Sequence, residues 1–95
     1  MKDYERRPKT LEQAFGLTLV GWRKKKGFSQ MDLAVSSGYS LRYIGDIERG
    51  TKSATMRTMH DLATLLDVRL SVLVIEAEAL AARPKANKPS AKSKG

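Results

Sequence analysis

The fold is decided by residues 26–50, which read KGFSQMDLAVSSGYSLRYIGDIERG. The segment from Ser29 to Asp32 has the form of a capping box, in which a serine and an acidic residue three positions later cap a helix start. Gly38 then breaks this short helix, and Ser40 can cap a second helix that runs to the end of the stretch. The pattern therefore predicts two short helices joined by a tight turn that contains a glycine.

Small and apolar side chains within this stretch explain how the two helices can pack. Ala34 is small enough to let them approach closely, and Ile44 and Ile47 lie three residues apart, which anchors the second helix to a core. The opposite side of the second helix is then free to face outward. We expect this outward stripe to consist of Leu41, Arg42, Gly45, Asp46 and Arg49.

Apolar residues on both sides of this stretch also recur at helical spacing. Upstream, they predict a first helix that ends near Gly27, and downstream, Thr55 can cap a fourth helix. The buried face predicted for the first helix consists of Leu11, Phe15, Leu19 and Trp22. The buried face predicted for the fourth helix consists of Met56, Met59, Leu62, Ala63 and Leu66.

Residues 68–75 are ambiguous, because large apolar residues alternate there as in a strand and β-branched residues dominate. Residues 76–82, in contrast, strongly favour a helix. A lone strand among helices would have no partner to pair with, so we expect a fifth helix that begins at about Leu70. The sequence thus predicts an all-α domain of five helices over residues 11–82.

The spacing of several short motifs resembles that of the lambda-repressor/Cro-like helix-turn-helix family, also called the xenobiotic-response-element family. The resemblance covers roughly residues 14–75. It implies a lambda-repressor-like domain, with the helix-turn-helix at its second and third helices, that binds double-stranded DNA sequence-specifically as a small transcriptional repressor or activator. Residues 40–49 would enter the major groove. The motifs that carry the resemblance are Phe28-Ser29-Gln30, Leu33-Ala34, Gly38-Tyr39-Ser40 and Ile47-Glu48-Arg49-Gly50.

The resemblance also implies roles for single positions. Arg23 and Glu48 would form a structural ion pair that ties the first helix to the third. Gln30 would contact a phosphate and buttress the base-reading helix. The base-reading positions would be Ser40, Leu41, Arg42 and Asp46. The phosphate-contacting positions would be Ser29, Gln30, Tyr43, Arg49, Thr51 and Lys52.

Several of these positions leave alternatives open. Arg42 either donates two hydrogen bonds to guanine or stays solvated, partly neutralised by Asp46 four residues later. We favour Asp46 as an orienter of this arginine over a direct reader of cytosine. Leu41 offers only an apolar contact, for instance to a thymine methyl group. Gly45 costs about 1 kcal/mol relative to alanine in a helix, which suggests a close approach of the backbone to DNA.

The net charge of +8 comes mainly from the two ends of the chain. Residues 1–10 carry a net charge of +2 and are expected to form a flexible arm. Residues 83–95 carry +5 and no large apolar side chain, so we expect a disordered basic tail that adds non-specific attraction to phosphates. Residues 11–82 carry only +1, so the arrangement of charge must create any local field there.

The composition argues against several functional classes. The chain has no cysteine and one histidine, which leaves little for a metal site, and we expect neither a metal nor another cofactor. We find no pair of nucleophile and base and no phosphate-binding loop, so we do not expect an enzyme. No stretch approaches the ~18–20 apolar residues of a membrane span, and we expect a cytoplasmic protein with no membrane partner.

The segment from Leu70 to Leu80 carries more apolar side chains than one small core needs. We therefore expect it to form a two-fold interface between two copies of the chain. The residues expected in this homodimer interface are Val72, Val74, Ile75 and Leu80. An alternative function remains open at this point, because similar helical modules occur in antitoxins and bridging coactivators, whose main partner is a protein.

Overall fold

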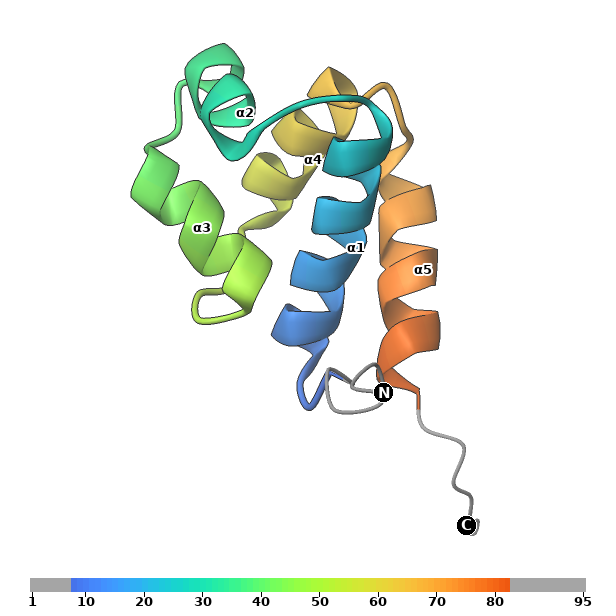
Figure 1. Cartoon of the computed structure of the whole chain (residues 1–95). Helices are drawn as coiled ribbons and strands as arrows, with labels where there is room; N and C mark the ends of the chain where they lie inside the picture. Colours follow the sequence, from blue (N-terminus) through green and yellow to red (C-terminus); the bar gives the residue numbers. More distant parts are fainter. Residues whose placement is uncertain (1–7, 83–95) are drawn as a thin grey trace, which may run out of the picture.

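The structure is a computed structural model, and it describes residues 8–82. The elements in this part are α1 (Leu11–Lys25), α2 (Gln30–Ser37), α3 (Leu41–Arg49), α4 (Met56–Leu65) and α5 (Leu70–Ala81). The predicted all-α fold is confirmed, and the ambiguous residues 70–75 form the first half of α5. Helix α1 packs against both α3 and α5, while α2 and α3 together form one flank of the molecule (Figure 1).

The first four helices begin where a serine or threonine caps them. In each case, the capping hydroxyl accepts a hydrogen bond from the backbone N–H three residues later. The cap of α2 is a complete capping box, because Asp32 also accepts a hydrogen bond from the backbone N–H of Ser29 at 2.8 Å. The three caps predicted from the sequence, at Ser29, Ser40 and Thr55, are confirmed. The capping residues are Thr10, Ser29, Ser40 and Thr55.

The segment before α1 differs in part from the expected flexible arm of residues 1–10. Thr10 caps α1, and Pro8 is buried. The backbone N–H of Lys9 donates a 2.7 Å hydrogen bond to the side chain of Gln13, one turn into the helix. These three residues therefore belong to the helical domain. The rest of the expected arm and the expected basic tail lie outside the described residues.

One apolar core holds the helices together, and it contains side chains from all five. The prediction of burial is wrong for two residues, since Leu11 is 55% and Met56 is 72% exposed. Each is the first residue of its helix, so it lies at the outer end of the predicted apolar stripe. Trp22 is half-buried at the edge of the core. The core residues are Ala14, Phe15, Leu19, Leu33, Ala34, Ile44, Ile47, Leu62, Ala63, Leu66, Leu73 and Ala77.

Helix α1 approaches α3 at backbone distance. A Cβ atom on Gly16 would collide with the carbonyl oxygens of Ile47 and Glu48 at the end of α3. A Cβ atom on Gly50, which follows α3 with φ +76°, would lie only 2.6 Å from the Cα atom of Gln13 in α1. Glycine at these two positions therefore allows the end of α3 to rest directly on α1.

Helix α5 covers the other side of α1, and Trp22 joins the two helices. Its indole N–H donates a 2.8 Å hydrogen bond to a carboxylate oxygen of Glu76 in α5. The ammonium group of Lys25 lies 4.8 Å from the centre of the indole ring, at cation–π distance. Within residues 8–82, no helix has the length and apolar character needed to cross a membrane.

Candidate nucleic-acid interface

A tight turn sets the angle between α2 and α3. Gly38 ends α2 in the left-handed conformation (φ +83°), and its N–H donates a 2.9 Å hydrogen bond to the carbonyl of Ala34. Two residues later, Ser40 caps α3. This arrangement is a helix-turn-helix, and its glycine has the positive φ that few other residues adopt without strain. The buried Ile44 and Ile47 hold the inner face of α3 in the core, as predicted.

A buried polar network fixes the end of α3 from behind. Arg23 in α1 donates two hydrogen bonds to the carboxylate of Glu48, at 2.6 and 3.1 Å, and a third to the carbonyl of Phe28. The amide nitrogen of Gln30 donates to the same carboxylate at 2.7 Å. The Glu48 side chain is only 4% exposed. The expected Arg23–Glu48 pair is thus present, and Gln30 ties the start of α2 to it.

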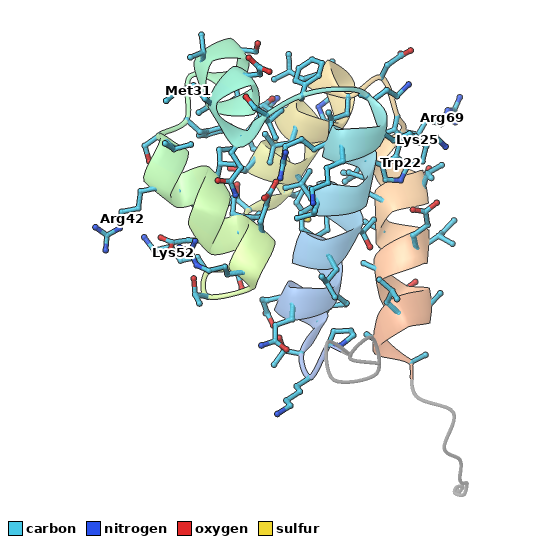
Figure 2. All side chains as sticks on the ribbon, in the orientation of Figure 1. Trp22, Lys25, Met31, Arg42, Lys52 and Arg69 are labelled. Carbon is cyan, nitrogen blue, oxygen red and sulfur yellow. The ribbon has the colours of Figure 1, made fainter. Side chains whose placement is uncertain are left out.

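The outer face of α3 is exposed, and its basic side chains point away from the core. Figure 2 shows Arg42 projecting from α3, and Lys52 from the loop after it, on the flank opposite to α5. Leu41 is 42% exposed, so an apolar side chain lies beside Arg42 at the start of the helix. The hydroxyl of Ser40 accepts the capping hydrogen bond from Tyr43 and keeps its proton for another partner.

Asp46 does not orient Arg42 as expected. Its carboxylate accepts a 2.7 Å hydrogen bond from Arg49, and it lies 3.3 Å from the hydroxyl of Thr51 and 3.9 Å from the ammonium of Lys52. These three donors all lie toward the end of α3, so they draw the carboxylate away from Arg42. Burial raises the pKa of Asp46, but the hydrogen bonds and positive charges of these partners outweigh it and hold the pKa below its usual value.

Gly45 does not offer its backbone to a ligand as expected, because it is buried under Arg49. The three atoms nearest to an added Cβ would all belong to the Arg49 guanidinium, at 3.0–3.7 Å. Sequence reasoning missed this contact, although a sequence signal exists. A glycine and an arginine four residues apart lie on the same side of a helix, with an aspartate one position after the glycine.

Two tyrosines, one in the turn before α3 and one in α3, contact α4. The Tyr39 hydroxyl donates a 2.7 Å hydrogen bond to Asp61, and the Tyr43 hydroxyl lies 3.4 Å from the hydroxyl of Thr58. The two rings pack edge to face, with centroids 5.5 Å apart. Both hydroxyls thus have partners inside the protein. Tyr43 was expected to contact phosphate and instead points its hydroxyl toward α4.

The remaining phosphate-contacting candidates flank the outer face of α3. Ser29 and Gln30 lie at the N-terminus of α2, and Thr51 and Lys52 follow the end of α3. Both groups are placed where free backbone amides or a cation can meet an anion. The structure therefore brings the candidate side chains together on one flank, around α3.

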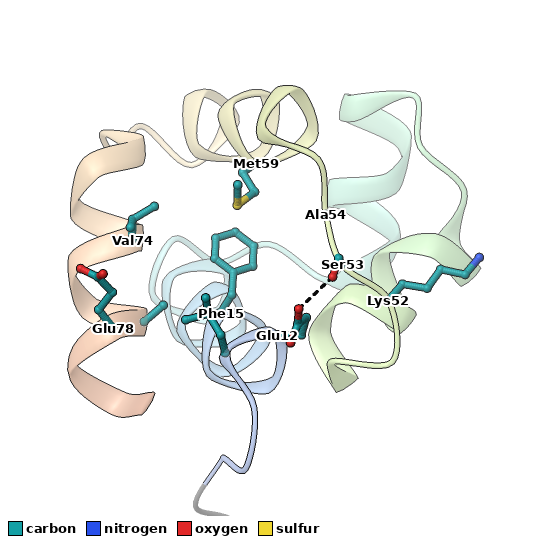
Figure 3. A pocket seen from close by; sticks show the side chains of 10 residues that line it. Glu12, Phe15, Lys52, Ser53, Ala54, Met59, Val74 and Glu78 are labelled. Atoms are coloured by element: carbon teal, nitrogen blue, oxygen red, sulfur yellow. Dashed lines mark hydrogen bonds between the residues drawn. The ribbon is translucent and has the colours of Figure 1, made fainter. Parts of the chain in front are cut away.

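The candidate dimer residues on α5 do not share one environment. Ile75 is 63% and Leu80 is 43% exposed, while Val72 is half-buried. Val74 instead lines a cavity of about 220 Å³ between α1, α4 and α5, next to Phe15 (Figure 3).

The rim of this cavity carries two carboxylates, and it also includes Lys52 from the loop after α3. It carries Glu12, which accepts a 3.0 Å hydrogen bond from Ser53, and Glu78 (Figure 3). Within residues 8–82, no group of three or more histidine, aspartate or glutamate side chains is placed to hold a metal ion.

Comparisons with known proteins agree with this geometry. The chain matches the helix-turn-helix family model over residues 19–73. It is 31% identical over 58 residues to an uncharacterized HTH-type transcriptional regulator, y4dJ, of Sinorhizobium fredii, which corresponds to 61% of this chain and 75% of that protein. It is also 32% identical over 67 residues to the transcriptional regulator ClgR of Mycobacterium tuberculosis. The matched region covers 70% of this chain but only 60% of that protein.

Two solved structures share the fold. The clp gene regulator ClgR from Corynebacterium glutamicum superposes with a TM-score of 0.74 at 29% identity, over 79% of this chain and 97% of that one. The restriction-modification controller protein C.AhdI from Aeromonas hydrophila superposes with a TM-score of 0.63 at 37% identity, over 65% of this chain and 94% of that one. The chain therefore belongs to the Cro/C1-type helix-turn-helix family of DNA-binding transcriptional regulators.

Proposed function

We propose that this chain reads a specific sequence of double-stranded DNA by placing α3 in the major groove. One observation carries this proposal. The inner side of α3 is fixed by apolar packing and by the buried Arg23–Glu48–Gln30 network, while its outer side presents exposed side chains. A rigid helix with one free face is what a fixed register on DNA bases requires.

We infer that the start of α3 contacts base edges directly. Arg42 can donate two parallel hydrogen bonds to guanine, and the adjacent Leu41 can contact a thymine methyl group. The free hydroxyl proton of Ser40 adds a donor at the same end of the helix. Asp46 is engaged by Arg49, Thr51 and Lys52, so its role is to position other side chains rather than to read bases.

Phosphate contacts would come from both sides of this face. The hydroxyl proton of Ser29, the backbone N–H of Gln30 and the positive end of α2 would be offered to one phosphate. The Gln30 side-chain amide uses one N–H on Glu48, which leaves the second N–H for an anion. Thr51 and Lys52, after α3, would contact a second phosphate. Tyr43 would not contribute a phosphate contact, because its hydroxyl donates to Thr58.

We further propose that the chain acts as a homodimer in the cytoplasm, where the target DNA of such regulators lies. Two copies would bind half-sites about 34 Å apart, one helical turn of DNA. The exposed Ile75 and Leu80 on α5 support an interface there, together with the half-buried Val72. Val74 faces the cavity against α1 and α4 and would lie outside this interface.

Selection of binding sites from random DNA tests this function. The chain would be equilibrated with a random library at about 150 mM salt, and its affinity for the selected site would be compared with that for a scrambled site. We expect a ratio of about 10³ or more and a selected site with two related halves. A ratio near one with a steep salt dependence would overturn the proposal. It would direct the search to a protein partner, as for an antitoxin or a bridging coactivator.

A further inference from the structure

We propose that Arg49 is a second base-reading arginine, placed on the DNA-facing side of α3 by Gly45 and Asp46. The family resemblance implies a phosphate contact for Arg49, because it stands at the end of α3. The observed position of its guanidinium, along the outer side of α3, favours a base contact instead. The proposal rests on the DNA-binding function above and names a side chain that determines its specificity.

The guanidinium of Arg49 is folded back along α3. Its Nη1, Nη2 and Cζ atoms would lie 3.0, 3.6 and 3.7 Å from a Cβ atom on Gly45, one turn earlier. The side chain therefore occupies the space of the side chain that Gly45 lacks. This space lies on the outer stripe of α3, between Arg42 and the end of the helix, and not in the loop beyond it.

Asp46 holds the guanidinium in this position. Its carboxylate binds Nη2 of Arg49 at 2.7 Å and is itself held by Thr51 and Lys52. The Asp46 side chain is 14% exposed and the Arg49 side chain 61% exposed. The fixed end of the pair is thus the carboxylate, while the guanidinium remains open to a ligand.

The donors left on Arg49 match guanine. An arginine has five N–H donors, and the contact with Asp46 accounts for one of them. The remaining donors on Nη1, Nη2 and Nε can form the two parallel hydrogen bonds that guanine O6 and N7 accept in the major groove. A side chain fixed before binding loses less rotamer freedom when it does so. Lys52, which has a compact charge on a flexible stem, is the better suited of the two to a phosphate.

Site selection with Arg49→Lys tests the base contact, because lysine keeps the charge and loses the paired donors. We expect one guanine position in each half-site to lose about tenfold or more of its discrimination, while the other positions keep theirs. Lys52→Gln serves as the contrasting variant. The Lys52 ammonium lies 3.9 Å from Asp46, whereas Arg49 lies 2.7 Å from it, so this change should mainly weaken binding to all sequences alike. If Arg49→Lys also weakens all sequences alike, the inference is wrong, whereas a wild-type chain without sequence preference would overturn the proposed function itself.

Gly45→Ala tests the positioning. The new Cβ would meet Nη1 of Arg49 at 3.0 Å and displace the flexible guanidinium, while alanine favours the helix more than glycine does. We expect the same guanine position to lose discrimination although the thermal midpoint is equal or higher. Full discrimination in the folded Gly45→Ala variant would show that Arg49 does not depend on this space and would overturn the inference.

Discussion

Glu48 is the residue on which three neighbouring elements depend, because it accepts hydrogen bonds from both Arg23 in α1 and Gln30 in α2. Replacing Glu48 with Gln leaves the Arg23 guanidinium buried without a counter-charge. We expect the free energy of unfolding to fall by about 3–5 kcal/mol, measured by urea denaturation.

A surface ion pair provides the control for this prediction. Arg57 and Asp61 in α4 lie 4.0 Å apart with exposed side chains, so Arg57→Gln should cost less than about 0.5 kcal/mol. If Glu48→Gln costs as little as Arg57→Gln, the buried pair does not hold α3 in place.

The two carboxyl groups with lowered pKa values, Asp32 and Asp46, predict how stability depends on pH. Both have a usual pKa of 3.8, lowered in Asp32 by the Ser29 backbone and side-chain hydrogen bonds. A lowered pKa in the folded state means that the stabilisation is complete above the usual pKa and is lost as the pH falls through the folded value. We therefore expect the free energy of unfolding to fall below about pH 4, since the unfolded chain then binds more protons.

Asp46→Asn separates the two contributions, because the amide no longer titrates. Urea denaturation across this acid range should show a shallower fall for Asp46→Asn than for the unmodified chain, and Asp32→Asn should remove the other part. An identical pH dependence in all three proteins would contradict the hydrogen bonds and ion pairs assigned to these two carboxylates.

At the scale of elements, the contact between α1 and α3 depends on one small residue. Alanine at Gly16 would push a methyl group into the backbone carbonyls of Ile47 and Glu48, and neither carbonyl can move without shifting α3. We expect Gly16→Ala to destabilise the fold by about 1–3 kcal/mol, as overpacking does.

Gly21 in the same helix is the matched control. Beyond its chain neighbours and the backbone of its own helix, a Cβ on Gly21 has no atom within 4 Å, so Gly21→Ala should stabilise the chain by up to about 1 kcal/mol through helix propensity alone. Thermal unfolding of both variants, followed by circular dichroism, measures the difference. Similar midpoints for the two would show that α1 and α3 are not in backbone contact.

The elements themselves were predictable because their signals are local. A serine or threonine cap depends on a hydrogen bond within one turn, so the starts at Ser29, Ser40 and Thr55 follow from the sequence alone. The choice of a helix for residues 70–75 was also correct, since none of the other segments offered a strand to pair with.

The candidate site was less predictable, because it depends on where long side chains turn. Asp46 has possible partners at Arg42, four residues before it, and at Arg49, three residues after it, and sequence spacing alone favoured the wrong one. The choice was decided by Thr51 and Lys52, whose loop folds back onto the end of α3. Such a loop path has no periodic signature in the sequence.

At the scale of the whole molecule, α1 lies between the DNA-facing flank around α3 and helix α5, whose outer surface faces away from that flank (Figure 1). A dimer formed through α5 would leave both α3 helices free. We expect Ile75→Asp, which places a charge on the most exposed of the candidate interface residues, to shift sedimentation at tens of micromolar from dimer to monomer.

Val35→Asp is the control for this change, because Val35 is an apolar side chain of α2 that is 74% exposed and lies far from α5 in the chain. It should leave the dimer intact. A wild-type chain that sediments as a monomer at this concentration, while still binding its selected DNA, would contradict the proposed interface.

The bond between Trp22 and Glu76 gives the molecule a built-in optical reporter. Trp22 is the single tryptophan of the chain, and its indole is half-buried between α1 and α5, with a carboxylate on its N–H and an ammonium over its ring. Fluorescence emission from an indole shifts to longer wavelength when water reaches it. The emission wavelength of the unlabelled protein therefore reports whether α5 is packed on α1. It can be followed during unfolding, and it also shows whether this packing persists when the proposed dimer dissociates.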